Sequence, residues 1–301
     1  MPYEYIQCFG FCIQTDTAYN PDLASDTKEA IAIRIRALVK AASIIQEDFY
    51  SRIQWPGSSQ PEWSKTLKIL VAPEFFYRPP GNGGAYQFND EFKYTVQQAF
   101  SGFGWQELSD WLIVAGTIIS KQQSNIPNQW VGHNTAIIVR GGQRACDLIE
   151  KQFVSTRDGM EKYIHGNYEA ALGNIDVAQY MQSTQPIVFD VDGIHIGVEI
   201  CLDHFSGVLR NRGQQAHIHL ITACGMPIQW NNVIAPLVFR VDGQYKLQAG
   251  LANFAIRNQF GLRWLNYAHV DYNNKFQSHL ITKLNRDNKK VTLAAFPIVK
   301  L

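Results

Sequence analysis

The stretch PIVFDVDGIHIGVEICLD, Pro186 to Asp203, decides the fold class. Its first half alternates apolar and polar residues up to Asp192-Gly193, a dipeptide typical of two-residue hairpin turns. Its second half, Ile194 to Ile200, is rich in β-branched residues and ends abruptly at Cys201. Open α/β sheets bind ligands at the carboxyl ends of their strands, so this cysteine is a candidate nucleophile. A helix that begins near Phe205 would lower the pKa of its thiol. The alternative is that Cys201 is a small buried apolar residue.

The composition excludes several classes of partner. Apolar residues make up 46% of the 301 residues, and 27 Lys and Arg against 26 Asp and Glu leave a formal net charge of +1. This balance offers no electrostatic footprint for nucleic acid or an anionic membrane. The N-terminal residues lack the basic region of a secretory signal, and the longest apolar run, Trp111 to Ile119, is too short to cross a bilayer. Five cysteines without CxxC spacing predict a reduced, cytoplasmic protein.

Apolar runs and periodicities predict an α/β protein in which strands outnumber helices. We expect strands at Tyr3 to Gln14, Leu67 to Ala72, Trp111 to Ser120, Asn134 to Arg140 and His217 to Ala223, and helices at Asp22 to Tyr50, Phe205 to Gly213 and Leu247 to Gln259. Residues 134–140 and 145–155 form a hairpin pattern, which favours mixed sheets over a purely parallel one. Residues 156–184 and 226–246 read as insertions. No linker divides the chain, so a single domain, residues 1–301, is expected.

Three of the expected strands end in reactive side chains: Glu74 after LKILVAP, Lys151 in DLIEKQF, and Cys201. Each charged residue alone could be an ordinary surface group at a strand end. Together they form a workable catalytic set. A carboxylate can accept the thiol proton, the sulfur can attack carbon, and an ammonium group can stabilise the oxyanion that develops.

The stretches VAPEFF, IEKQF and GVEICLD resemble the Glu, Lys and Cys motifs of the nitrilase superfamily of carbon–nitrogen hydrolases, in the same order. NTAIIVRGG and FAIRNQFG resemble flanking segments of that family, so the resemblance extends over essentially the whole chain. It implies a four-layer α-β-β-α sandwich of two mixed β-sheets. It also implies a thiol-dependent hydrolase of non-peptide carbon–nitrogen bonds, an amidase or nitrilase-like enzyme.

The same resemblance implies roles for individual residues. Glu74 would be the general base, Lys151 the oxyanion stabiliser and Cys201 the nucleophile, with the backbone N–H of Leu202 as a second oxyanion donor. The implied substrate is a small amide or nitrile, with no cofactor, and the implied assembly is a homodimer or higher oligomer. The alternatives are a catalytically inactive binding protein with this fold, or acyl transfer by the same triad.

Two features depart from the family pattern. Many amidase branches carry a second glutamate after the lysine, and Glu161 is the nearest candidate here. The position two residues before the cysteine is usually small or apolar, but here it is Glu199. Strand alternation would put Glu199 on the same side as Cys201, where its charge would raise the thiol pKa unless a cation offset it. Glu199 is therefore either an auxiliary site residue or a structural partner of another polar group.

Further candidates surround this set. The Pro/Gly-rich segment Arg78 to Asn89 follows the candidate base, so Tyr77 and Tyr86 are candidate substrate-binding residues, together with His204. His217 and His219 would share one face of a strand, a spacing that some metal sites use, with Asp203 or His204 as a third ligand. Histidines two residues apart often only form hydrogen bonds in a sheet, so we expect no metal. His204 also has no evident orienting partner for a Cys–His pair.

Overall fold

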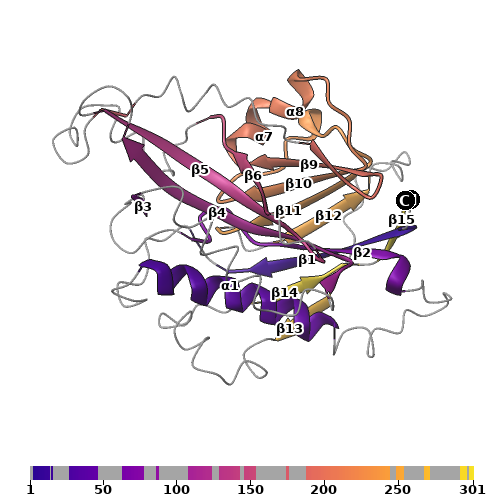
Figure 1. Cartoon of the computed structure of the whole chain (residues 1–301). Helices are drawn as coiled ribbons and strands as arrows, with labels where there is room; N and C mark the ends of the chain where they lie inside the picture. The colour runs from indigo at the N-terminus through magenta and orange to yellow at the C-terminus, as the bar shows by residue number, and fades with distance from the viewer. Residues whose placement is uncertain are drawn as a thin grey trace.

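The computed structural model describes residues 3–13, 15, 27–46, 63–77, 86–87, 108–123, 129–142, 146–153, 174–175, 188–244, 249–253, 268–271, 292–296 and 298–301. These residues form two β-sheets that pack face to face, with helices on the outer sides (Figure 1).

Sheet A has the strand order β13-β14-β1-β2-β4-β5-β6. Its strands are β1 (Tyr5–Cys12), β2 (Thr66–Val71), β4 (Trp111–Gln123), β5 (Gln129–Arg140), β6 (Cys146–Glu150), β13 (Ala268–Asp271) and β14 (Thr292–Ala295). The short strands β3 (Tyr86–Gln87), β7 (Asn174–Ile175) and β15 (Val299–Lys300) pair with β4, β5 and β1. β1, β2 and β4 run parallel, whereas β5 is antiparallel to β4 and β6, and β14 is antiparallel to β1 and β13.

Sheet B has the order β12-β11-β10-β9-β8. Its strands are β8 (Val188–Val191), β9 (Ile194–Ile200), β10 (Ile218–Ala223), β11 (Leu237–Asp242) and β12 (Ala249–Asn253). β10 is parallel to both β9 and β11, and β8 and β12 are antiparallel edge strands. Both sheets are mixed, as predicted.

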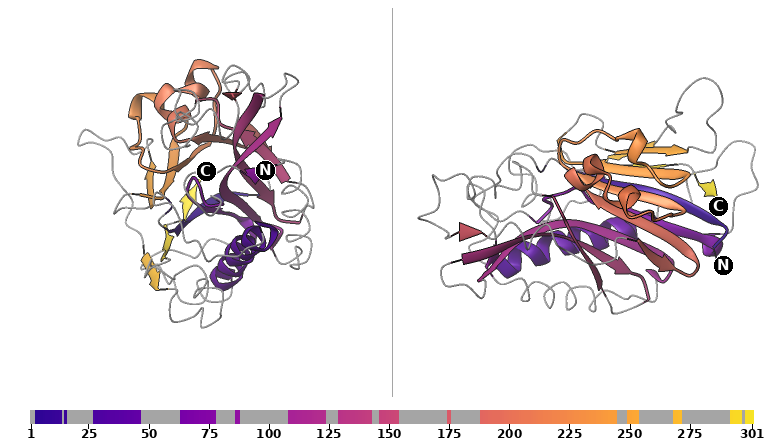
Figure 2. Two further views of the ribbon diagram at one scale, coloured as in Figure 1. Left: turned by 90° about the vertical axis from the view of Figure 1, so that its left-hand side faces the viewer. Right: turned by 90° about the horizontal axis from the view of Figure 1, so that it is seen from above.

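The four layers follow from strand alternation, because successive side chains of a strand point to opposite faces. On β1, Cys8 lies in the apolar core between the sheets, whereas Phe9 packs beneath helix α1 (Thr27–Ile44). A second apolar core lies between sheet A and α1. The expected apolar face of the helix, including Ile31, Ile35 and Leu38, is buried in it. Helices α7 (Leu202–Ser206) and α8 (Val208–Asn211) cover the outer face of sheet B (Figure 2). The described residues therefore confirm the α-β-β-α order.

The two predicted hairpins are confirmed. Asp192 and Gly193, with φ of 52° and 87°, join β8 to β9, and the register pairs Val191 with Ile194. Positive φ at both central residues is the geometry of a type I′ turn, which matches the twist of the flanking strands. β5 and β6 pair antiparallel, with Thr135 opposite Glu150.

Three expectations were wrong. The helix after the cysteine begins at Leu202 rather than Phe205, and Gly207, in the left-handed conformation, divides it into α7 and α8. Ala249–Asn253 is a strand rather than helix because it pairs with β11 along the edge of sheet B. Residues 226–246 are not an insertion, since they contain η5 (Trp230–Asn232) and the fully buried strand β11. The helix expected beyond Asn253 lies outside the described residues.

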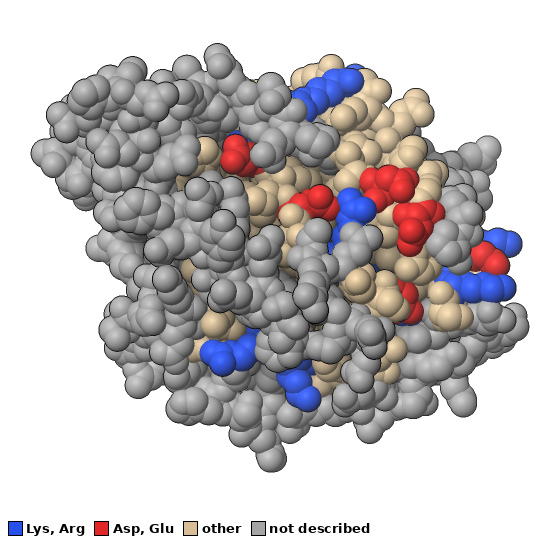
Figure 3. All heavy atoms as spheres, viewed as in Figure 1, with Lys and Arg blue, Asp and Glu red and all other residues tan. Residues whose placement is uncertain are grey.

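Two further observations concern the surface charges and the helices of the described residues. On the face shown in Figure 3, acidic and basic side chains are interspersed. Within the described ranges, no helix combines the length and apolar character needed to cross a membrane.

Gly141 generates a stability prediction. It follows β5 in the turn toward β6, where its N–H donates to the Trp111 carbonyl at 2.8 Å, and an added Cβ would overlap the backbone carbonyl of Leu108. Because backbone cannot rotate away as a side chain can, Gly141→Ala should strongly lower the free energy of unfolding, measured by urea titration. Gly213→Ala is the matched control: its φ is +65° but its Cβ would meet open space, so it should cost only roughly 1–2 kcal/mol. Equal costs for the two variants would contradict the packing explanation.

Candidate active site

The carboxyl end of β10 forms hydrogen bonds with the segments that carry Cys201, after β9 of sheet B, and Glu74, after β2 of sheet A. The Cys201 N–H donates to the Thr222 carbonyl at 2.9 Å, and the Glu74 N–H donates to the Ala223 carbonyl at 3.3 Å. The Thr222 hydroxyl also donates across the sheet interface to the Ala72 carbonyl at 3.0 Å. Two residues 127 positions apart in the chain (201 − 74) are therefore held against adjacent peptide groups.

The backbone is strained at both of these positions, directly after β9 and shortly after β2. Cys201 has φ 47° and ψ −103°, and Phe75, directly after Glu74, has φ 61°. Non-glycine residues rarely adopt positive φ, and such strain of about 1–3 kcal/mol persists only where the surroundings enforce it. The Phe75 N–H donates to the Thr117 hydroxyl at 2.9 Å, next to a β-bulge in β4 between Val114 and Thr117. The bulge thus supports the turn that carries Glu74.

Glu74 and Lys151 form a fully buried ion pair. The Lys151 ammonium donates to Glu74 Oε1 at 2.8 Å, and both side chains have 0% exposure. The Asn134 amide donates to the same oxygen at 3.0 Å, and the Asn134 carbonyl accepts the Lys151 N–H at 2.8 Å. The ammonium also lies 5.9 Å from the centre of the Phe75 ring. β5 therefore orients both charged partners at once.

The Cys201 thiol completes the set. Its side chain is 2% exposed, and the thiol lies close enough to Glu74 and Lys151 for their charges to shift its pKa. Burial is the main cause that raises the pKa of this thiol, and the charge of Glu74 raises it further. Lys151 and the backbone N–H of Cys224 lower it. The balance favours a neutral thiol, contrary to the thiolate expected from the helix terminus.

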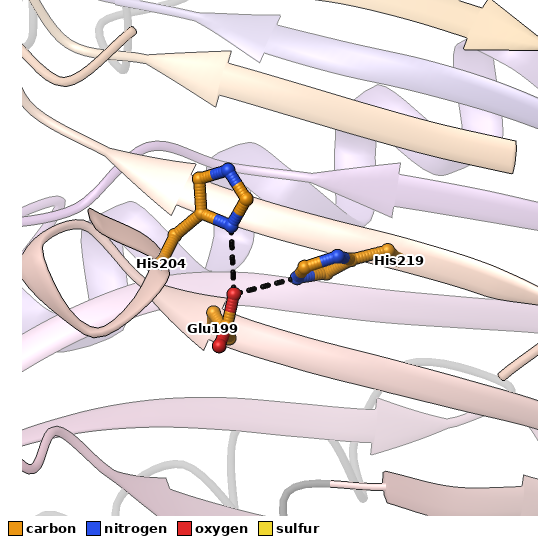
Figure 4. A group of neighbouring side chains, drawn as sticks. All are labelled: Glu199, His204 and His219. Atoms are coloured by element: carbon orange, nitrogen blue, oxygen red, sulfur yellow. Dashed lines mark hydrogen bonds and ion pairs between the residues drawn. The ribbon is translucent and has the colours of Figure 1, made fainter. Parts of the chain in front are cut away.

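Glu199 does not share the side of Cys201, which corrects the expectation from strand alternation. Alternation ends at Ile200 because Cys201 has positive φ. The Glu199 carboxylate lies on the outer face of sheet B, with Oε2 2.7 Å from His204 Nδ1 and 2.9 Å from His219 Nε2 (Figure 4). Its Oε1 accepts the Leu209 N–H at 2.8 Å. We call Glu199, His204 and His219 the Glu199 cluster; their side chains are at most 1% exposed.

The Glu199 cluster is the group of potential metal ligands among the described residues, with ligand atoms within 4.8 Å of one another. It differs from the set considered from the sequence. His217 is not part of it, since its Nδ1 accepts the exposed His195 N–H at 2.8 Å. Asp203 binds backbone N–H groups of the lysine segment instead.

Asp203 was underrated by sequence reasoning. Its buried carboxylate accepts the N–H of Gln152 at 3.0 Å and that of Phe153 at 2.8 Å, which ties α7 to the segment directly after Lys151. Burial raises its pKa to about 8, against the lowering effects of Lys151 and of these two N–H groups. The only sequence signal was its place two residues after the cysteine.

Two of the other predicted site residues, Tyr77 and His204, are not brought to the thiol. Tyr77 lies on the α1 side of sheet A, with its ring edge-on to Phe76. His204 points into the Glu199 cluster, and both its ring nitrogens are hydrogen-bonded, so it is not a base for Cys201. The Tyr86 backbone pairs with β4, but its side chain and the whole of Glu161 lie outside the described residues. Leu202 opens α7, where the first N–H groups have no intrahelical partner.

No family model matches the chain, and no curated protein matches it. Solved structures do. Nit3 of Saccharomyces cerevisiae, described as a member of branch 10 of the nitrilase superfamily, is 14% identical with a TM-score of 0.47 and covers 83% of each chain. A carbon–nitrogen hydrolase from Helicobacter pylori is 9% identical with a TM-score of 0.49, over 98% of this chain and 90% of that one.

A variant of the amidase from Nesterenkonia sp. AN1, in complex with butyramide, is 11% identical with a TM-score of 0.47, over 98% of this chain and 91% of that one. The sequence motifs resemble the superfamily to which the yeast and Nesterenkonia structures are assigned. At these identities we derive function from the geometry of the site rather than from the relatives.

Asp203 generates a pH prediction. Its pKa is raised on folding, from 3.8 to about 8, so the folded protein holds a proton that the unfolded chain releases between these values. The contribution of this proton to the free energy of unfolding is fully present below about pH 4 and is lost as pH rises through about 8. Asn cannot ionise, so Asp203→Asn should remove this decline. The free energy of unfolding of the variant, relative to that of the parent, should therefore increase by up to ~1.4 kcal/mol for each pH unit between these values. Urea unfolding at pH 5, 6.5 and 8 measures it; parallel pH profiles would contradict the prediction.

Proposed function

We propose that the chain is a thiol-dependent hydrolase of non-peptide carbon–nitrogen bonds, with Cys201 as nucleophile, Glu74 as general base and Lys151 as oxyanion stabiliser. One observation carries this proposal: a carboxylate and an ammonium group form a fully buried ion pair at separate strand ends, close enough to the buried thiol of a third strand end for both charges to act on it. Burial of two such charges is costly unless they are paired, and function is a common reason to retain them.

In acylation, sulfur attacks the carbonyl carbon while its proton passes to the Glu74 carboxylate. The charge of Glu74 acts on the neutral thiol, so the proposed transfer needs no separate proton carrier. The negative charge that develops on the substrate oxygen is stabilised by the Lys151 ammonium and the Leu202 N–H. The tetrahedral intermediate then collapses, the C–N bond breaks, and Glu74 returns the proton to the leaving amine.

In deacylation, Glu74 takes a proton from water, and the resulting hydroxide attacks the thioester carbon. The same two donors stabilise the second oxyanion. Collapse breaks the C–S bond and releases the acid, and Glu74 returns the proton to sulfur. Covalent catalysis therefore divides one difficult hydrolysis into two steps that share one base. Asn134 supports both steps because it holds Glu74 and the Lys151 backbone in register.

The triad variants test this proposal. Cys201→Ala should abolish turnover, Glu74→Gln should be nearly inactive, and Lys151→Met should lose roughly 10²–10³ in kcat as an oxyanion donor is removed. The substrate panel contains short amides, ureas, N-carbamoyl amino acids and nitriles, with ammonia release as the readout. Intact-mass spectrometry should detect an acyl adduct during turnover, and peptide mapping should place it on Cys201.

Cys146→Ala is the matched control, because Cys146 packs against the core on the α1 side of sheet A. It should keep full activity and the adduct. An adduct on Cys224 or Cys146, or full activity in Cys201→Ala, would refute the proposed nucleophile. A parent protein that releases no ammonia from any substrate and carries no adduct would favour a non-hydrolytic binding protein.

A further inference from the structure

The hydrogen bonds of the Glu199 cluster determine which histidine nitrogens carry protons. The Gln229 backbone N–H donates to His204 Nε2 at 2.9 Å, so this nitrogen must offer a lone pair. A neutral imidazole has one lone pair and one N–H, and the N–H therefore sits on Nδ1 and donates to Glu199 Oε2. Only a donor is compatible with a carboxylate oxygen 2.9 Å from His219 Nε2, so that nitrogen also carries a proton.

This protonation pattern opposes a metal site. His204 Nδ1, the atom nearest the carboxylate, has no lone pair left for a metal while Nε2 accepts from the backbone. The cluster is instead a hydrogen-bonded anion: Glu199 Oε2 accepts the His204 imidazole N–H and lies 2.9 Å from His219 Nε2, and Oε1 accepts the Leu209 N–H. The two histidines lower the pKa of Glu199 against the raising effect of burial.

A single carboxylate thereby connects four elements around the cysteine. Glu199 itself is on β9, two residues before Cys201. His204 is on α7, three residues after it, Leu209 is in α8 and His219 is on β10 (Figure 4). The segment is held further by Asn232, whose amide donates to the carbonyls of His204 and Phe205 at 2.9 and 2.8 Å.

The held segment contains the strained residue. Cys201 sits at φ 47° between Glu199 and His204, and its carbonyl accepts the N–H of His204 at 3.0 Å. Strained backbone relaxes unless its flanks are fixed. Relaxation here would rotate the Cys201 side chain away from Glu74, because φ and ψ at this residue decide to which side of sheet B the thiol points.

We propose that Glu199 is a positioning residue, which, with His204 and His219, holds Cys201 in the backbone conformation that aims its thiol at Glu74. The role rests on the proposed function in that Cys201 is the nucleophile. Glu199 acts through geometry, since its carboxylate lies on the outer face of sheet B, where it bonds His204 and the Leu209 N–H.

Glu199→Gln tests the role with minimal change of shape. A glutamine has one acceptor oxygen, so its NH2 group must face at least one of the N–H donors and that contact is lost. We expect kcat to fall by ~10²-fold, the typical cost of misplacing a reacting group by about 1 Å, with KM little changed. The alkylation rate of Cys201 by iodoacetamide should fall while its pH midpoint stays that of the parent. His219→Gln, whose amide can offer an N–H near the position of Nε2, should retain more kcat than His219→Leu.

The matched control is Asp110→Asn. Asp110 neutralises the buried Lys68 at the opposite end of β2 from Glu74, so its loss destabilises the protein without touching the cysteine segment. It should lower the melting temperature and leave the kcat of the folded protein unchanged. If Glu199→Gln also lowers only the melting temperature, or if it shifts the pH midpoint of alkylation, the positioning role is wrong.

Two further outcomes separate the competing explanations. Stoichiometric metal in the purified parent, lost in Glu199→Gln, would overturn the role in favour of a metal site. If the parent hydrolyses none of the panel, the proposed function fails. Cys201 alkylation that is slower in Glu199→Gln than in Asp110→Asn would still support the positioning role. Equal alkylation rates in the two variants would refute that role.

Discussion

The buried ion pair between Glu74 and Lys151 is the interaction on which the rest of the structure depends. Two charges with no solvent exposure are tolerated only when each is paired and its remaining hydrogen bonds are satisfied. The Asn134 amide donates to the same carboxylate oxygen as the ammonium, and the aromatic ring of Phe75 lies near the ammonium. The two partners come from strand ends 77 residues apart, so the pair also fixes how β2 and β6 end relative to each other.

The second constraint is that Cys201 follows a strand of the other sheet. Apolar packing between the sheets is not directional and would tolerate small shifts. Alignment comes instead from hydrogen bonds at the end of β10, which bind the backbone of Cys201 and Glu74 to adjacent carbonyls. The Glu199 cluster then supports the same segment from the outer side of sheet B. Polar groups at one strand end thus provide the precision that the apolar core cannot.

Burial outweighs the helix terminus at the thiol. A macrodipole contributes typically 0.3–1 kcal/mol at exposed sites, and α7 is a helix of only five residues. Full burial can shift a pKa by several units, at about 1.4 kcal/mol per unit. Burial, with the charge of Glu74, therefore raises the pKa of the thiol despite the helix terminus.

The sequence by itself determined strands such as β2 and β10 and the two hairpins, and it supplied the candidate set Glu74, Lys151 and Cys201. Apolar runs such as LKILVA and the Asp192-Gly193 turn are local signals, and the structure confirms their elements because local preference and burial agree there. Only the tertiary structure decided the facing of Glu199, the strand Ala249–Asn253 and the contact of Asp203 with Gln152. The physical reason is common to all three. Positive φ at Cys201, pairing at a sheet edge and hydrogen bonds across 51 residues depend on neighbours distant in the chain, and no local pattern encodes them.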